Sequence, residues 1–99
     1  MRTRTAIATL AVLALPAFPT RADSPSKEMH EVMEESSESV PQMEMSGDVD
    51  KDFAKMMAHH HRSGIKMAQI QAEKGKDPEL KRLAQKILSS QQEELKVLE

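Results

Sequence analysis

The apolar residues beyond position 48 recur at the spacing of an α-helix rather than that of a β-strand. Acidic residues follow Asp48, and Gly75 provides a stop, so we predict a helix from near Asp48 to about Lys74. At about 100° per residue, one stripe of this helix contains Phe53, Met57, His60, Gly64, Met67 and Gln71.

A second helix is predicted to begin after Asp77. Asp77 is a favourable N-cap, Pro78 suits the first helical position, and Glu79 complements the positive end of the helix dipole. Because the connection is so short, residues 48–99 are predicted to form an antiparallel helical hairpin in an all-α protein. The facing stripe of the second helix contains Leu80, Leu83, Ala84, Ile87, Gln91, Glu94, Leu95 and Leu98.

Two facing stripes in a chain of 99 residues without cysteine bury little apolar area. We therefore expect the chain to be a homo-oligomer, in which paired hairpins complete a four-helix bundle. In an antiparallel pair we expect His60 and His61 to lie level with residues near 91–92, and Met57 to lie level with Leu95.

The first 22 residues have the pattern of a signal peptide. Arg2 and Arg4 precede an apolar run of 13 residues, positions 6–18, which is shorter than the roughly 20 residues that a membrane-spanning helix needs. Proline and small residues then favour cleavage after Ala22. The mature chain is expected to be periplasmic or secreted, with no membrane insertion after cleavage.

Residues 23–47 are predicted to form a disordered acidic arm, because serine, proline and acids dominate and large apolar runs are lacking. A helical turn over residues 27–35 is expected to be weak in isolation. Removing residues 1–22 takes away three arginines and no acid, so the formal charge changes from −2 to −5. With this acidic balance and two aromatic residues in 99, nucleic-acid binding is not expected.

Methionine is in excess, with 8 of 99 residues, and several lie where they could bind a metal ion. On the first helix Met57 lies three and four residues before His60 and His61, so a thioether and imidazoles can converge. Met67 is about 10.5 Å further along the helix axis than His60 and is expected to serve a neighbouring site or the core. Glu94 on the second helix would ligate the ion or receive a ring N–H.

The arm is expected to add a looser Cu(I) site, because its ligands have no core to join. Imidazole suits Cu(II) and thioether suits Cu(I), so copper is the predicted ion, and silver would satisfy the same thioethers. The candidate arm ligands are Met29, His30, Met33, Met43 and Met45.

Two other interpretations remain open. The polar residues could instead form a metal-free register or pH-sensing cluster within a helical interaction module. The same ligands could also serve a small metalloenzyme, but no nucleophile–base pair is visible, so an enzyme is not expected.

The combined spacing of these residues resembles the CopM-like periplasmic copper-binding family, a domain-of-unknown-function family numbered 305. The similarity covers about residues 48–96 and includes Asp50, Phe53, the Gly75–Leu80 turn and Ile87–Leu88. It implies a ferritin-like helical bundle, export, and copper tolerance or homeostasis involving a periplasmic copper-handling partner. It marks as site positions Met57, His60, His61, Met67, Gln91 and Glu94.

Overall fold

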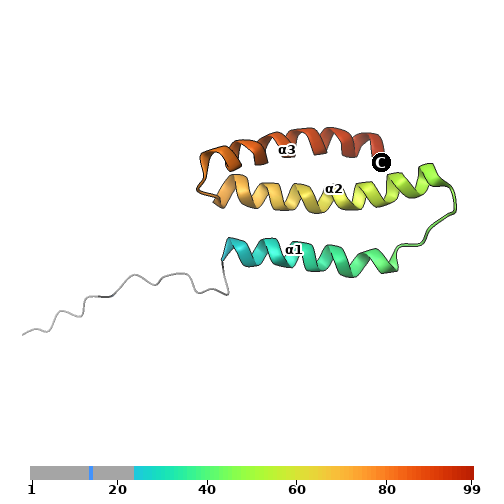
Figure 1. The fold of residues 1–99 in the computed structure, drawn as a ribbon, viewed down its shortest axis with the longest axis horizontal. Coiled ribbons are helices and arrows are strands. Elements are labelled where there is room, and N and C mark those ends of the chain that lie inside the picture. The colour runs from blue at the N-terminus through green and yellow to red at the C-terminus, as the bar shows by residue number, and fades with distance from the viewer. Residues whose placement is uncertain (1–13, 15–23) are drawn as a thin grey trace, which may run out of the picture.

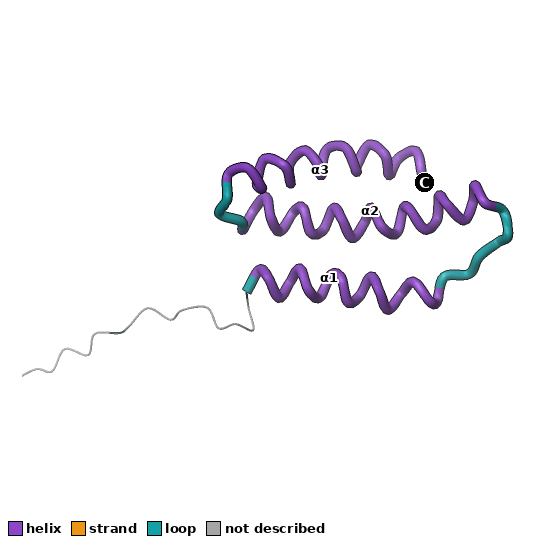
Figure 2. Tube along the Cα trace, in the orientation of Figure 1, coloured by secondary structure: helices purple, strands orange, loops and turns teal. Residues whose placement is uncertain are grey.

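A computed structural model describes residue 14 and residues 24–99, and the second of these parts is helical throughout apart from its connections. Helix α2 (Val49–Lys74) lies between α1 (Pro25–Ser39) and α3 (Pro78–Leu98) and runs antiparallel to both (Figures 1 and 2). No strand occurs in the described part. The elements are α1 (Pro25–Ser39), the 3-10 turn η2 (Val40–Gln42), α2 (Val49–Lys74) and α3 (Pro78–Leu98).

The two helices predicted from position 48 onward are confirmed, as are the residues that begin them. Asp48 caps α2 by accepting hydrogen bonds from the backbone amides of Asp50 at 3.0 Å and Lys51 at 3.1 Å. Asp77 caps α3 by accepting one from the amide of Leu80 at 2.9 Å. These side chains satisfy amides that have no partner inside the helix, which sets both starting points.

The interface of α2 with α3 consists mainly of small residues. The fully buried apolar side chains of the described part are Ala58, Ala68 and Ala84, and no large side chain is completely enclosed. Gly64 lets the helices approach closely, since a Cβ atom there would lie 2.5 Å from Oε1 of Gln91. The close approach places His61 opposite Glu94 and Gly64 opposite Gln91, about three residues beyond the expected register.

Residues 25–42 differ from the sequence prediction, because they are helical rather than disordered. Ser24 caps α1 by accepting a hydrogen bond from the amide of Lys27 at 3.2 Å, and Pro25 occupies the first turn. A helix this short is marginal alone, so contacts with α2 decide its formation. The segment is polar and has few large apolar residues, so contacts with residues distant in sequence stabilise the helix.

Polar contacts hold α1 along α2. Lys74 Nζ donates to the two carboxylate oxygens of Glu28 at 2.6 and 2.9 Å, and Lys66 lies 3.7 Å from Glu35. Such exposed pairs each contribute about 0–1 kcal/mol, so α1 is attached less firmly than α3.

The predicted signal peptide, residues 1–22, lies outside the described residues except for position 14. Among the helices that are described, none is both long enough and apolar enough to cross a membrane.

Candidate metal centre

His61 is the most constrained of the predicted ligands. Its side chain points from α2 towards α3 and the residue is 8% exposed. Nδ1 lies 2.9 Å from the carbonyl oxygen of Met57, and Nε2 lies 2.5 Å from Oε2 of Glu94. Because a carbonyl can only accept, the Nδ1–H donates to Met57, and this orients Nε2 towards the Glu94 carboxylate.

The thioether of Met57 lies in the same place as these two groups. One groove near the open end of the α2–α3 pair is lined by Phe53, Met57, His61, Glu94, Val97 and Leu98. The tertiary structure therefore brings together one sulfur, one imidazole nitrogen and one carboxylate from the predicted set. Apolar side chains form the rest of the groove, and the Glu94 side chain is 61% exposed, so water reaches its carboxylate.

His60 belongs to a different groove from His61. The two rings are 6.2 Å apart between centroids and inclined by 63°. His60 is exposed and lines a second groove together with Met43, Met56 and Met57. Met57 is thus shared between the two grooves, whereas the predicted four-residue site around both histidines is divided.

Met67 lies apart from both histidines, as its distance along the helix predicted. It lines an apolar groove that also contains Met29, Gly64 and Gln91. The Oε1 atom of Gln91 is buried and has no hydrogen-bond partner within the described residues. Gln91 therefore lies where α2 and α3 pack at Gly64 and does not line the His61 groove.

The methionines of the predicted arm are not gathered into one site. Met29 lies beside Met67 and Met43 beside Met57, whereas Met33 and Met45 are each 48% exposed. His30 is exposed and lies 3.4 Å from a carboxylate oxygen of Glu34. The arm contributes one methionine to each of two grooves on α2 because α1 and its connection run along that helix.

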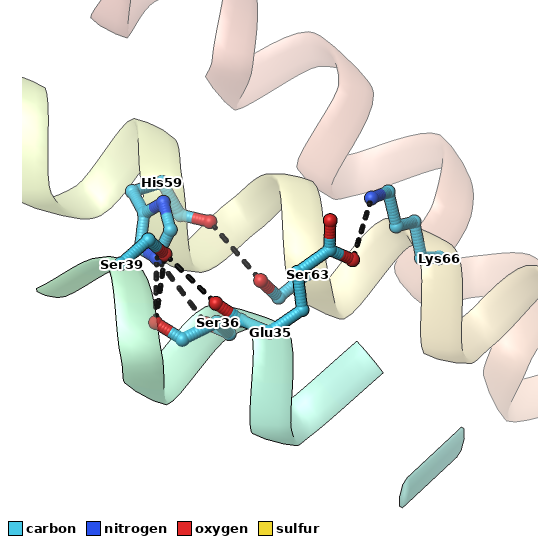
Figure 3. Close-up of polar contacts among 6 residues, drawn as sticks. All are labelled: Glu35, Ser36, Ser39, His59, Ser63 and Lys66. Atoms are coloured by element: carbon cyan, nitrogen blue, oxygen red, sulfur yellow. Dashed lines mark hydrogen bonds and ion pairs between the residues drawn. The ribbon is translucent and has the colours of Figure 1, made fainter. Parts of the chain in front are cut away.

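His59, which was not among the predicted ligands, joins α1 to α2. Figure 3 shows its ring against two serines of α1. Its Nε2 lies 3.3 Å from Oγ of Ser36, 3.2 Å from Oγ of Ser39 and 3.1 Å from the carbonyl oxygen of Ser36. The spacing of three between these serines is a helical signal, but it gains meaning only once α1 is known to be a helix.

The segment between η2 and α2 is tied to the first turns of α2. Oδ1 of Asp52 accepts hydrogen bonds from the amide and the hydroxyl of Ser46 at 2.8 and 2.9 Å, and Oδ2 accepts one from the amide of Gly47 at 3.1 Å. Hydrogen bonds from Ser46 lower the pKa of Asp52 below its ordinary value of 3.8, helped by Gly47 and the charge of Lys55. No sequence argument identified this arrangement.

Within the described residues, no group of three or more His, Cys, Asp and Glu side chains is arranged to hold a metal ion. A centre for a metal here would have to include methionine sulfur. That requirement favours a soft ion over zinc, calcium or magnesium, whose ligands are nitrogen, oxygen or thiolate.

Comparison with known proteins gives one match. A family model described as "Domain of unknown function (DUF305)" matches residues 6–99, which is nearly the whole chain. No curated protein and no solved structure matches the chain.

Proposed function

We propose that this chain, which belongs to the DUF305 family, is an exported copper-binding protein of the periplasm. It would sequester or carry Cu(I) or Cu(II) through Met and His ligands and so serve copper tolerance or homeostasis. The observation that supports this most strongly is the groove in which His61, Met57 and Glu94 meet.

The orientation of His61 suits a metal ligand. Ligating histidines commonly donate the second ring N–H to a carbonyl or carboxylate, which selects the tautomer. Here Nδ1 contacts the carbonyl of Met57 at 2.9 Å, so Nε2 would face the ion. Nε2 and Oε2 of Glu94 are 2.5 Å apart, so an ion would take the place of their direct contact. Because metal ligands must be deprotonated, copper binding is expected to weaken at low pH.

Anaerobic titration with Cu(I) and a competing chelator tests this proposal. His61→Ala and Met57→Leu should each lower the affinity, whereas Met33→Leu is the control because Met33 is 48% exposed and outside the groove. Binding weaker than micromolar, or equal affinity in all three variants, would remove the copper hypothesis. A parallel titration with Ag(I) is expected to succeed, since silver accepts the same thioethers.

A metal-free interaction module is the second candidate, and the same histidine favours it. Both ring nitrogens of His61 have a protein partner, so the buried imidazole is satisfied without an ion. In this alternative the His61–Glu94 contact sets the helix register or senses pH. A change of oligomer size with pH in metal-free protein, together with no copper binding, would favour it.

Self-association is proposed because large apolar side chains are left exposed. Phe53 is 57% exposed, Leu80 52% and Val97 87%, and a second hairpin could cover them to complete a four-helix bundle. Light scattering at several concentrations tests this, and a monomer at high concentration would contradict it.

Copper would be the cargo of this protein rather than the catalyst of a reaction, with delivery to or from another periplasmic copper-handling protein. Steady oxidation of Cu(I) in air by the purified protein would contradict a binding role and favour an enzyme.

A further inference from the structure

The groove beside His60 contains an unusual set of donor atoms for so small a surface. Three thioethers and the imidazoles of His59 and His60 line it, and no carboxylate does. The sulfurs come from Met56 and Met57 on α2 and from Met43 on the segment that follows η2. Within residues 24–99, the ring of His60 has no hydrogen-bond partner, in contrast to both neighbouring histidines. Its lone pair is therefore available to a ligand.

Backbone hydrogen bonds, rather than contacts of its side chain, position Met43 in this groove. Its amide donates to the carbonyl of Val40 at 3.1 Å, which closes η2. Lys55 Nζ donates to the carbonyl of the next residue, Glu44, at 2.9 Å. The segment is thus fastened on both sides of Met43 before any ion binds.

Hydrogen bonds also fix the part of this segment that follows Glu44. Asp52 accepts three hydrogen bonds from Ser46 and Gly47, and Gly47 has a φ of 85°, which other residues rarely adopt. Preorganisation of this kind lowers the entropy lost when a ligand is bound. Met43 should therefore lose less conformational entropy on binding an ion than a methionine on a free arm would.

The chemistry of these donors selects the ion. Thioether sulfur is a soft, uncharged donor and an imidazole that binds a metal is uncharged, so the groove supplies no anion to balance a divalent ion. Glu94, whose carboxylate contacts His61, lines the other groove. Soft neutral donors without an anion favour a monovalent d10 ion.

We propose that Met43, Met56, Met57 and His60 form a separate site for Cu(I) or Ag(I), which is closed by the segment between η2 and α2. This inference deepens the proposed copper binding and rests on it only for the choice of ion. Cu(II) would then be confined to the groove of His61 and Glu94. Because Met57 lines both grooves, its replacement would weaken both sites.

Titration of the full mature chain with Ag(I), which needs no reductant, tests the proposal. Met43→Leu keeps the approximate volume of the side chain and removes its sulfur. Since loss of an indirect partner of a metal ligand typically lowers affinity about 10–100-fold, loss of a direct ligand should lower Ag(I) affinity by at least about tenfold. Cu(II) affinity should stay unchanged. Met45→Leu is the matched control, because Met45 is on the same segment but does not line the groove.

A second measurement does not depend on a variant. In the unmodified chain, the ε-methyl NMR signals of Met43 and Met56 should shift on addition of Ag(I), and that of Met45 should not. Equal Ag(I) affinity in Met43→Leu and Met45→Leu, or an unmoved Met43 signal, would overturn the site.

The two proposals can fail separately. If His61→Ala and Glu94→Gln leave copper binding intact while Met43→Leu weakens Ag(I) binding, the His61 centre fails and this site stands. If His61→Ala and Glu94→Gln weaken copper binding while Met43→Leu has no effect on Ag(I) binding, the His61 centre stands and this site fails.

Discussion

Replacing Glu94 separates a structural role of its contact with His61 from a metal-binding role. In Glu94→Ala, the buried Nε2 of His61 loses its partner at 2.5 Å. An unsatisfied buried polar group costs about 1–3 kcal/mol. The Glu94 side chain is 61% exposed, against 10% for that of His61, so water can replace part of the lost bond and the cost should be about 1 kcal/mol.

Urea unfolding of the metal-free protein measures this cost. With an m value of about 1 kcal/mol/M for a small chain, the midpoint should fall by roughly 1 M in Glu94→Ala. Glu94→Gln keeps a hydrogen-bonding oxygen, so its midpoint should stay close to that of the original chain. Its Cu(II) affinity should nevertheless fall, because a neutral amide is a weaker ligand than a carboxylate.

The reasoning would be refuted by an unchanged midpoint in Glu94→Ala, since the contact would then contribute nothing in solution. Equal destabilisation in the two variants would show that charge, rather than the hydrogen bond, is what His61 requires.

Three further predictions concern the helix contacts. Because its folded pKa is lowered, Asp52 stabilises the segment before α2 above about pH 4 and loses that effect as the pH falls through the folded pKa. The amide NMR signal of Gly47 should shift over this pH range, and Asp52→Asn should abolish the shift. Gly64→Ala places a Cβ 2.5 Å from Oε1 of Gln91, so the overpacking cost of about 1–3 kcal/mol should offset or exceed the roughly 1 kcal/mol gained in helix propensity. In thermal unfolding, adding Gln91→Ala to this variant should restore stability, and additive effects of the two substitutions would count against the contact. His59→Ala should speed hydrogen exchange in α1 but not in α3, because its ring binds two serines of α1; equal protection of α1 in both proteins would contradict that role.

The two helices from position 48 onward could be predicted closely because their signals are local. Asp48, Asp77 and Pro78 determine where α2 and α3 begin, through hydrogen bonds and backbone angles within a few residues. The predicted register between α2 and α3 was wrong by about three residues, because the register depends on the close approach at Gly64 rather than on the length of the turn.

The candidate site was predictable in its residue types but not in its grouping. Met57, His61 and Glu94 were placed together correctly, because spacing along α2 and the antiparallel turn constrain them. The predicted site placed His60 with His61, but the two histidines line different grooves. Met56 and His59 were not among the predicted ligands, although both line the His60 groove. Each of these depends on the position of α1 and its connection.

The sequence by itself determined where α2 and α3 lie along the chain, because caps and apolar periodicity act over a few residues. Only the tertiary structure decided that residues 25–39 form a helix and that Met43 lies beside Met56. The reason is physical: local interactions in a short, polar helix with few large apolar residues do not offset its conformational entropy. Contacts from Lys74, Lys66 and His59 stabilise it across 20 or more residues of sequence.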